Sequence, residues 1–560
     1  MKKRIISLVL AVAMAISAFA ILAACNNEPA PPEATPTPTP TPTPDAVTPP
    51  ENPEIPELPD DEYDGAGNLV IAPDGLEITV FYTFGGNGTI LPDQLIFQAA
   101  EEITGVRINN IANPNMADEQ EALTEMMLSG NFADLIFGHV GQISPLISEG
   151  LFMDISDLIY NYAPNIVRYF NLSPPVQVAS TWHDGGIYFL RSALNGADSI
   201  SEQPSKLWFI RYDWLDQLGL QVPTTLDEYR DALYAFKEAE IAGPETIPFF
   251  ARQGDIRTLL QLWGVQGDWA NWFIDANGQI GHGQFTEEYK TAMIELAQWY
   301  ADGIIDAEIF TRGGNARAEL LSQNLGGAAV DWPGSTGALN YNEDIRDAVP
   351  DLDWGIFRMP RNINGELRSE WGRGSTSHFG WGIHRDVDPD LALALVRFMD
   401  FWFTQEGALL VSHGVEGVSF NYVDGVPQWI PEAHEHEGGV PFWLRTLGIQ
   451  EFPKWPGDIM IEVGGFAERT REGYFDHIEN VLTIASFPPL SMLPEEQAIL
   501  DRIVELGSLT DQFRMEALMG IIDVEAEWDS YIEQARHMGL FDAMAAYQAA
   551  YDRFMAAQRN

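Results

Sequence analysis

Short apolar runs alternate with amphipathic segments between residues 70 and 140, and this alternation limits the fold more than any other feature of the chain. Short apolar runs suit buried strands, whereas apolar residues spaced three and four apart suit helices. The expected strands are 76–82, 106–111 and 134–137, and the expected helices begin at Pro92 and Asp118. Strands that alternate with helices predict an α/β layer with a mostly parallel sheet. In such a sheet ligands bind beside the carboxyl ends of the strands.

The same signals continue through the rest of the chain. Further strands are expected at 206–211, 326–330, 354–359 and 379–384, with a hairpin at 273–282. Further helices are expected at 224–240, 286–302 and 388–403, and several more from Pro494 to the end. A chain of 560 residues is too long for one typical domain and predicts two or more.

The first 24 residues have the pattern of an export signal. Basic residues at positions 2–4 precede an apolar run at 5–24, and Cys25 is the only cysteine in the chain. The ending Leu-Ala-Ala-Cys resembles a bacterial lipobox, which implies cleavage before Cys25 and a lipid on its sulfur. An ordinary signal peptide with a chance cysteine, or a membrane-spanning anchor, remains an alternative because the apolar run is near spanning length.

A linker is expected from Cys25 to residue 68. Its centre, Thr35 to Pro44, is a strict Thr-Pro repeat. Proline fixes φ and restrains the preceding residue, so the repeat predicts an extended polyproline II spacer of about 30 Å. Such a spacer would hold a folded body away from the membrane, and its threonines could carry O-glycans.

Charge and cysteine content exclude several classes of function. A formal net charge of −51 repels polyanions, so we expect neither nucleic acid nor anionic lipid headgroups as partners. One cysteine allows no disulfide within the chain and no multi-cysteine zinc or iron–sulfur site. There is no Gly-rich phosphate-binding motif with its lysine, and no cofactor is expected.

Several motifs resemble a known family. The run "LWFIRYDWLDQLGL" at 207–220, followed by "VPTTLDEY", resembles family 1 extracellular solute-binding proteins of bacterial ABC importers. Further similar stretches follow in the family's order, at 130–138, 184–190, 275–306, 326–334, 401–420, 528–540 and 547–554. The last three are similar to the large LipO-like lipoprotein branch. The resemblance covers roughly residues 70–556.

The resemblance implies a two-lobed α/β fold of the type II periplasmic-binding-protein class, with a hinge, an interlobe cleft and a helical C-terminal region. By analogy, residues 69–200 and 331–380 form the first lobe, and residues 201–330 and 381–560 form the second. Part of the helical tail is expected to return across the hinge. The lobes would close on a ligand, a hinge motion known for periplasmic binding proteins.

The implied function is capture of a small solute, a mono- or oligosaccharide by default, for delivery to ABC permease subunits. No chemistry is done on the ligand. The protein is expected to be a monomer, anchored by lipid to the outer face of the cytoplasmic membrane of a Gram-positive-type bacterium. Tethering would keep the receptor at a high concentration near its permease.

The best ligand candidates are Asp331 and Trp332, which follow an apolar strand and precede a Gly/Ser turn. Aromatic rings cover the apolar faces of sugars, and carboxylates or arginines bind pairs of hydroxyls. In the implied family this loop commonly carries an aromatic residue at the cleft. Packing of Trp332 against the hinge is the alternative.

Other candidates lie at expected strand ends or in Gly/Ser-rich loops. They are Trp182, His183, Asp184, Tyr82, Asn87, His139, Arg211, Trp371, Arg373 and His378. Structural roles are the alternative. Residues 182–184 could form a turn with a buried tryptophan, and Arg211 could form an ion pair with one of the many acids. The three tryptophans at 263, 269 and 272 suit a core better than a binding surface.

Two segments contain metal-ligand residue types but do not predict a metal site. His434 to Glu437 lacks the one-turn spacing of histidines in a helical zinc site, and an acidic solvated loop is favoured. The turn Asp275-Ala276-Asn277-Gly278 lacks the glutamate pattern of a calcium loop.

Three functions therefore remain open from the sequence. The favoured one is a tethered solute receptor. The second is a surface glycosidase that uses two carboxylates, which 82 acidic residues cannot exclude. The third is a structural lipoprotein whose cleft binds nothing.

Overall fold

The computed structural model describes residues 49–50, 52–59, 70–83, 88–113, 119–191, 204–252, 255–268, 271–373, 376–423, 426–436, 439–450, 452–455, 466–488 and 490–559. The expected signal segment, Cys25, the Thr-Pro repeat and Asn87 lie outside these residues. None of the helices in the described ranges is long and apolar enough to cross a membrane.

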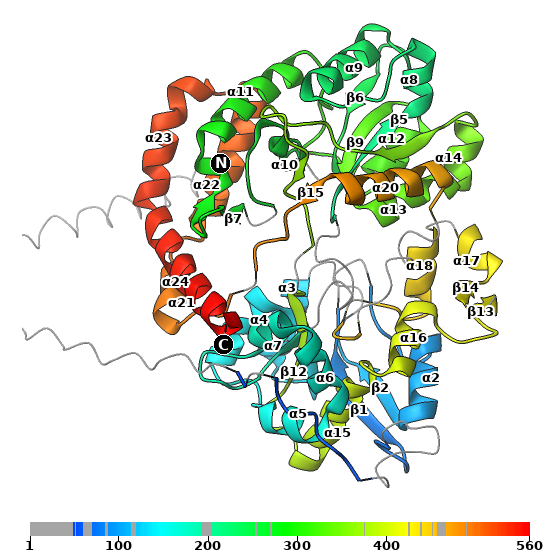
Figure 1. The fold of residues 1–560 in the computed structure, drawn as a ribbon, viewed down its shortest axis with the longest axis vertical. Helices are drawn as coiled ribbons and strands as arrows, with labels where there is room; N and C mark the ends of the chain where they lie inside the picture. The colour runs from blue at the N-terminus through cyan, green and yellow to red at the C-terminus, as the bar shows by residue number, and fades with distance from the viewer. Residues whose placement is uncertain are drawn as a thin grey trace, which may run out of the picture. The chain divides into compact units, whose positions relative to one another are not determined.

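The first sheet has the strand order β2-β1-β3-β12-β4. Its strands are β1 (Leu76–Phe81), β2 (Val106–Asn110), β3 (Leu135–His139), β4 (Leu190–Arg191) and β12 (Phe379–Ile383). Of these, β1, β2 and β12 are labelled in Figure 1. β1 runs parallel to β2 and β3, as the alternation of strands and helices predicts. β12 runs antiparallel to both β3 and β4, so the sheet as a whole is mixed.

Helices bury both faces of the first sheet. Ile78 and Val80 share one face because alternate residues of a strand point the same way, and they lie in the larger core. Phe81 and Ile136 pack in a second core on the opposite face. We call this sheet and its helices the first lobe. The helices are α2 (Leu95–Thr104), α3 (Glu119–Ser129), α4 (Val140–Ser148), α5 (Ser156–Tyr162), α6 (Pro164–Leu172), α7 (Pro174–Ser180), α15 (Pro389–Phe401) and α16 (Gln405–His413).

The second sheet has the order β10-β5-β9-β6. Its strands are β5 (Leu207–Arg211), β6 (Ile247–Phe249), β9 (Gly326–Asp331) and β10 (Trp354–Phe357). β5 is antiparallel to β9 and to β10, and β6 is parallel to β9. The register pairs Leu207 with Asp331 and Arg211 with Trp354. Asp331 and Arg211 therefore lie at opposite ends of β5.

This sheet is also buried on both faces. Trp208 and Ile210 pack into one core, and Leu207 and Phe209 into another. We call this sheet and its helices the second lobe. The helices are α8 (Tyr212–Leu218), α9 (Leu226–Glu238), α10 (Arg257–Leu260), α11 (Glu287–Ala301), α12 (Ala316–Ser322), α13 (Pro333–Gly337), α14 (Glu343–Ala348), α20 (Glu468–Asn480), α22 (Glu505–Leu518) and α23 (Val524–His537).

Smaller elements complete the fold. The predicted hairpin at 273–282 is present as β7 (Trp272–Ile274) and β8 (Ile280–His282). Another hairpin and two helices follow α16: β13 (Phe420–Val423), β14 (Val426–Trp429), α17 (Pro431–Glu435) and α18 (Gly439–Thr446). Short 3₁₀ turns are η3 (Gln261–Trp263), η4 (Gly283–Phe285) and η5 (Ala338–Tyr341).

The division into lobes differs from the expected one after residue 331. β10 pairs with β5 and so belongs to the second lobe, although residues 331–380 were expected in the first. β12 pairs with β3, and α15 packs in the core beneath it, although residues 381 onward were expected in the second. Both strands are short and apolar. Such a residue pattern suits a buried position in either sheet, so it does not indicate which sheet the strand joins.

Helix α20 covers the free edge of β10 at very close range. A Cβ atom at Gly473 would come within 2.0 Å of the Ile356 carbonyl oxygen, so this contact requires glycine. An uncovered edge strand is a template for unwanted pairing, and α20 removes that exposure. A pocket of about 310 Å³ lies beside this contact, lined by Tyr212, Arg358 and Arg469 among others.

Three chain segments between the lobes are hydrogen-bonded side by side. β11 (Arg368–Ser369) pairs with β15 (Leu482–Thr483). Gly372 donates its N–H to the Ile484 carbonyl oxygen at 3.0 Å and forms a bridge with Pro204. The Ser486 hydroxyl donates to the Gly372 carbonyl oxygen at 2.9 Å. We call residues 204–205, 369–373 and 482–486 the linking segments.

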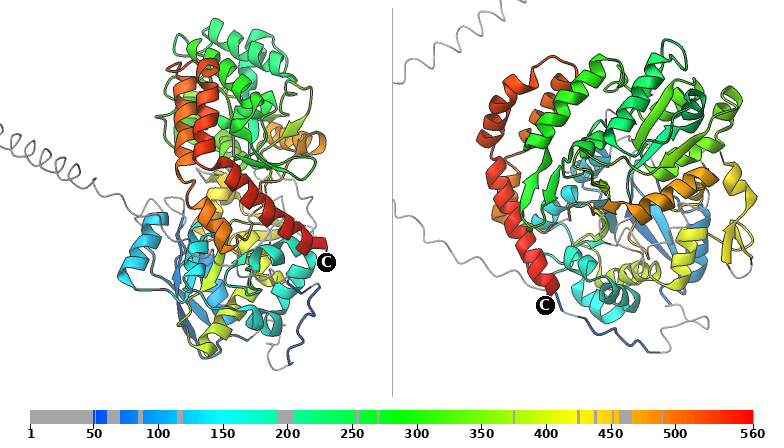
Figure 2. Two further views of the ribbon diagram at one scale, coloured as in Figure 1. Left: turned by 90° about the vertical axis from the view of Figure 1, so that its left-hand side faces the viewer. Right: turned by 45° about the horizontal axis from the view of Figure 1, so that its top comes forward.

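The last helices contact both lobes (Figure 2). α24 (Leu540–Arg559) packs on β8 of the second lobe and on α7 of the first, and on α21 (Pro494–Leu500). The Arg553 guanidinium pairs with the Glu496 carboxylate of α21. The expected return of the helical tail across the hinge is therefore present as a contact.

Part of the expected linker packs against the first lobe. The Asn171 side-chain amide donates to the Pro53 carbonyl oxygen at 3.0 Å, and Gln177 donates to the Pro50 carbonyl oxygen at 2.9 Å. Proline leaves its carbonyl oxygen available as an acceptor, which these amides use. The folded body thus includes residues near position 50, ahead of the expected start at 69.

A buried carboxyl group of α15 holds the start of α6. Asp400 is fully buried, and its oxygens accept the Ile166 N–H and the Asn165 side-chain amide, each at 2.7 Å. Burial raises the pKa of Asp400 to about 7, and these hydrogen bonds only partly oppose the increase. The folded protein therefore retains a proton that the unfolded chain releases at lower pH.

Because of Asp400, the free energy of unfolding should decrease as the pH rises from about 4 to about 7. Because the folded-state pKa lies above the unfolded value, the folded state binds more protons in that interval. The variant Asp400→Asn cannot titrate there. Its stability relative to the original chain should increase by about 3 kcal/mol between pH 5 and pH 8. Urea unfolding at both pH values measures this difference. Asp390→Asn, on the exposed face of the same helix, is the control, and an equal pH dependence in both variants would contradict the assignment.

Candidate functional site

The strongest polar cluster lies at the carboxyl end of β9. Asp331 is 2% exposed, and its Oδ1 atom accepts hydrogen bonds from Lys206 at 3.2 Å, Arg252 at 2.8 Å and the Trp332 backbone N–H at 2.8 Å. The Arg317 guanidinium lies 3.3 Å from Oδ2. Burial alone would raise the pKa of Asp331, but Lys206, Arg317 and Arg252 outweigh it and lower the pKa.

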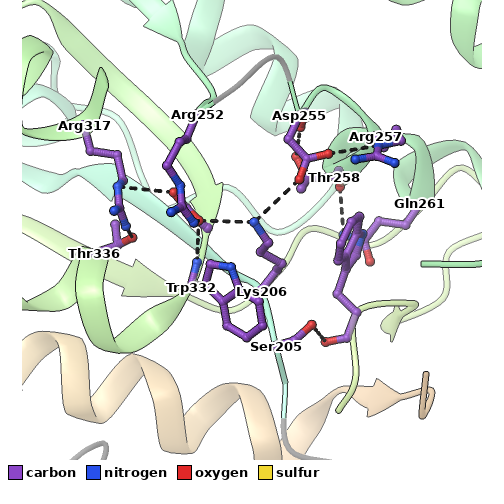
Figure 3. Close-up of polar contacts among 12 residues, drawn as sticks. Ser205, Lys206, Arg252, Asp255, Arg257, Thr258, Gln261, Arg317, Trp332 and Thr336 are labelled. Atoms are coloured by element: carbon purple, nitrogen blue, oxygen red, sulfur yellow. Dashed lines mark hydrogen bonds and ion pairs between the residues drawn. The ribbon is translucent and has the colours of Figure 1, made fainter. Parts of the chain in front are cut away.

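The topology of the second sheet brings these side chains together. Lys206 precedes β5, which is paired through Leu207 with Asp331. Arg252 follows β6, which runs parallel to β9 and so ends at the same edge. Arg317 comes from α12 and donates to the Thr336 hydroxyl of α13, the helix that follows β9 (Figure 3). It also donates to the Ser335 hydroxyl at 2.8 Å.

A second carboxylate extends the cluster. Asp255 lies 3.6 Å from the Lys206 ammonium and 3.1 Å from the Arg257 guanidinium (Figure 3). We call Lys206, Arg252, Arg257, Arg317, Asp255 and Asp331 the Asp331 cluster. It holds four cationic side chains against two carboxylates, which leaves an excess of two positive charges.

Two tryptophans flank the Lys206 ammonium. Its nitrogen lies 5.5 Å from the Trp332 ring centroid and 5.8 Å from that of Trp371, distances suited to cation–π attraction. Trp332 is partly exposed, whereas Trp371 is 1% exposed. The Trp371 carbonyl oxygen accepts the Ser205 N–H at 2.7 Å, so this tryptophan sits within the linking segments. Trp332 can offer a ring face to a ligand, whereas the buried Trp371 ring contacts only the protein side of Lys206.

A set of basic side chains lies at the edge of the first sheet. His139 ends β3 and His378 precedes β12, and their rings stack at 5.5 Å with an interplanar angle of 4°. Arg191 of β4 stands next to them because Gly380 of β12 pairs with it. We call His139, His378 and Arg191 the basic rim.

Burial sets the protonation states of the basic rim. It lowers the pKa of Arg191 to about 9, which still leaves the guanidinium charged at pH 7. Burial, reinforced by His139 and Arg191, lowers the pKa of His378 to about 4. Burial and then Arg191 lower the pKa of His139. Both rings are therefore neutral at pH 7, and His139 accepts the Gly141 N–H through Nδ1 at 3.1 Å.

The segment at 182–184 forms a turn beside the basic rim. Asp184 is exposed and closes the turn by accepting the Gly186 N–H at 3.0 Å and the Tyr188 hydroxyl at 2.9 Å. Trp182 lines a small cavity of about 10 Å³ together with Arg191. His183 lies partly exposed with its ring 5.6 Å from that of Trp182. Trp182 and His183 thus adjoin the basic rim, whereas Asp184 has a local structural role.

Two predicted ligand residues, Tyr82 and Arg211, lie away from the Asp331 cluster and the basic rim. Tyr82 is fully buried with its ring 4.5 Å from Phe137, so it belongs to the first core. Arg211 lies at the far end of β5 from Asp331, where it pairs with Asp213 and with the Asn324 side chain at 2.8 Å. Trp371, by contrast, is buried beside Lys206. Arg373 follows in the same linking segment and is partly buried.

Sequence reasoning missed Arg191, Lys206, Arg252 and Arg317. A lone basic residue next to an apolar strand was the available signal for Arg191 and Lys206, because a charge at that place needs a partner when buried. Arg252 and Arg317 carry no such signal. Only the parallel pairing of β6 with β9, and the packing of α12, brings them to Asp331.

The residues considered as metal ligands have structural roles. In the turn of the β7–β8 hairpin, Asp275 accepts the Asn277 and Gln279 N–H groups, each at 2.8 Å. Gln548 of α24 holds the same turn by accepting the Ile280 N–H at 2.8 Å. Across the described ranges of the chain, no group of three or more His, Cys, Asp or Glu side chains is placed to hold a metal ion.

Comparison with known proteins identifies the family. Residues 90–407 match the family described as bacterial extracellular solute-binding protein. The chain belongs to this family. The matched residues include every strand of both sheets except β1, and they include Asp331, Lys206 and the basic rim.

The solute-binding protein has relatives over most of its length. It is 22% identical over 506 residues to the fructooligosaccharide ABC transporter substrate-binding protein FusA of Streptococcus pneumoniae serotype 4, covering 83% of this chain and 88% of FusA. It is 23% identical to lipoprotein LipO of Bacillus subtilis over 355 residues, covering 59% of this chain and 65% of LipO. These relatives are transporter receptors and lipoproteins, not enzymes.

The fold is that of type II periplasmic-binding-protein-like receptors. The crystal structure of the alginate-binding protein AlgQ2 without calcium ion matches with a TM-score of 0.76 and 27% identity, covering 86% of this chain and 99% of AlgQ2. A complex of FusA with kestose matches with a TM-score of 0.68 and 19% identity, covering 86% of this chain and all of FusA. The expected two-lobed architecture is confirmed.

Asp331→Asn should destabilise the solute-binding protein by about 3 kcal/mol at pH 7, because it removes the charge that balances buried Lys206. The folded-state pKa of Asp331 is lowered, so its contribution is fully present above the unfolded pKa of about 4 and is lost as the pH falls below 4 through the lower folded-state pKa. Chemical unfolding at pH 7 and pH 3 measures the loss. The control, Asp347→Asn on the exposed face of α14, should change stability by less than about 0.5 kcal/mol. Equal effects of the two variants at pH 7 would contradict the assignment.

Proposed function

We propose that this protein captures an oligosaccharide between its lobes and delivers it to the permease of an ABC importer. The observation that carries the proposal is the partly exposed Trp332 ring beside the hydrogen-bonding groups of the Asp331 cluster. An aromatic face next to charge-assisted donors suits a sugar ring, which has apolar C–H faces and polar edges. The family and the names of relatives such as FusA support a sugar as the solute.

The linking segments support a hinge in this proposal. Trp371 connects Lys206 to the segments that join the lobes, and the lobes of such folds close around a ligand. A ligand that contacts both lobes favours the closed form by the difference between its affinities for the closed and open states. A permease that binds the closed form would then take up the loaded receptor.

Hydrolysis is not supported as the function. A glycosidase needs one carboxylic acid with a raised pKa to protonate the leaving group. The pKa of Asp331 is lowered, and its Oδ1 atom already accepts three hydrogen bonds. The other carboxylate of the cluster, Asp255, pairs with Lys206 and Arg257. Both acids hold cations in place, and the lowered pKa of Asp331 does not suit a proton donor.

An oligosaccharide should stabilise the compact part of the chain, residues 46–560. At a ligand concentration of 100 times Kd the gain should be about 2.7 kcal/mol, seen as a rise in Tm in a panel of mono- and oligosaccharides. Trp332→Ala should weaken binding by at least about tenfold without lowering Tm in the absence of ligand, whereas Trp332→Phe should bind nearly normally. If no sugar raises Tm while a peptide does, the carbohydrate assignment is wrong.

We also propose that Cys25 carries the lipid that holds the receptor at the outer face of the cytoplasmic membrane. The lipobox-like ending before Cys25 and the relative LipO support this anchor. Two acyl chains on one cysteine give stable anchoring, whereas a single chain gives only marginal binding.

Cys25→Ser should therefore release the protein from membranes. In a bacterial host with one membrane, the original chain should sediment with the membrane fraction and the variant should appear in the medium. Ser17→Ala, within the apolar run, is the control and should leave the protein in the membrane fraction. Retention of the Cys25→Ser chain would contradict the lipid anchor.

A further inference from the structure

Positive charge is concentrated where the ligand is proposed to bind, in a protein that is otherwise strongly acidic. The whole chain has 31 Lys and Arg against 82 Asp and Glu. The Asp331 cluster reverses that ratio, with four cationic side chains against two carboxylates. The cations therefore exceed what the two acids need for neutrality.

Part of this charge remains accessible. The Arg252 and Arg257 side chains are 23% and 21% exposed, whereas those of Lys206 and Asp331 are each 3% exposed. Arg252 binds Asp331 through a single nitrogen at 2.8 Å. A guanidinium has five N–H donors in a planar fork that matches a carboxylate, so Arg252 has geometry for a second acceptor.

The first lobe contributes one cation and two histidine rings. Arg191 of β4 is 2% exposed and charged at pH 7, and the neutral, stacked rings of His139 and His378 lie at the end of β3 and just before β12. His378 is seven positions after Trp371, which contacts Lys206. An extended chain of that length reaches about 25 Å at most, so one extended oligomer can reach both sets of side chains.

A neutral sugar would gain little from this arrangement. Its hydroxyl groups bind equally well to amides, to hydroxyls or to a single carboxylate, and none of these costs the burial of several cations. An acidic sugar has a different requirement, because a net charge of −51 repels it from the protein as a whole. Local positive charge offsets that repulsion at the place of binding.

We propose that the ligand is an acidic oligosaccharide whose carboxylates bind Arg252 of the second lobe and Arg191 with the paired histidines of the first lobe. This inference rests on the proposed function, since it names the class of sugar that the same site takes. Trp332 covers a sugar ring between the charged contacts. The carboxylates supply the acceptors that charge-assisted, bidentate arginine contacts need.

The decisive comparison uses one oligomer with and without its charge. Isothermal titration of the purified full chain with trigalacturonate and with its methyl ester isolates the carboxylates, because the two ligands otherwise share the same rings. The set is completed by trimers of glucuronate and mannuronate, by neutral fructo- and malto-oligosaccharides, and by a sulfated galactan trimer. We expect at least one uronate trimer to bind at least tenfold more tightly than its methyl ester.

The outcomes separate this inference from the proposed function. Tight binding of neutral oligosaccharides alone, or equal binding of acid and ester, overturns the inference and leaves the sugar receptor intact. Binding of the sulfated trimer alone overturns the assignment of carboxylates. Failure of every sugar to bind overturns the proposed function together with this inference.

Variants locate the contacts. Arg252→Gln should weaken binding of the preferred uronate by at least fivefold and weaken binding of its ester much less, because only the uronate loses a charge-assisted contact. Arg230→Gln, on the exposed side of α9, is the matched control and should leave both unchanged. Unchanged uronate binding by Arg252→Gln overturns the contact with the second lobe.

The basic rim predicts a pH dependence. A ligand carboxylate beside His139 and His378 favours their protonated forms, and a uronate stays ionised down to about pH 4. Affinity for the uronate should therefore rise severalfold between pH 7.5 and pH 5.5, and His378→Gln should reduce that rise. Arg191, the other charged group facing the two rings, stays charged throughout this range. A uronate affinity that does not change with pH overturns the contact with the basic rim.

Discussion

The candidate binding edge of the second lobe, where β9 ends at Asp331, depends on the ion pairs of the Asp331 carboxylate. This carboxylate joins the end of β9 to Lys206 before β5, to Arg252 after β6 and to Arg317 of α12. Removing a carboxylate from water is costly, and only several well-placed cations can offset that cost. The buried cations in turn need the negative charge of Asp331, because an unpaired buried cation is equally costly.

This interaction couples the fold to the binding edge. Lys206 is held by Asp331 and Asp255 and lies between the Trp332 and Trp371 rings. Trp371 in turn binds Ser205, and Gly372 binds Ile484 and Ser486, which ties the cluster to the linking segments. A displacement at the ligand side of Trp332 therefore reaches the segments that join the lobes through directly contacting groups.

The sequence anticipated the local structure well and the long-range pairing poorly. The strands at 76–81 and 207–211 and the helices at 226–238 and 287–301 formed where their apolar periodicity and caps placed them, because those signals act over a few residues. The assignment of β10 and β12 to lobes failed for the opposite reason. Each is a short apolar strand, and its partner is chosen by contacts far away in the chain.

The candidate site shows the same division. The sequence by itself determined the family motifs, the lone Cys25, the strongly acidic charge and the place of Asp331 and Trp332 at a strand end, since these depend on residue type and order alone. Only the tertiary structure decided that Tyr82 faces the core, that Arg211 lies at the wrong end of β5, and that Arg252, Arg317 and Arg191 join the binding edges. The reason is physical: a side chain's partners in a sheet are set by register and by helix packing, and neither is encoded in any short stretch of sequence.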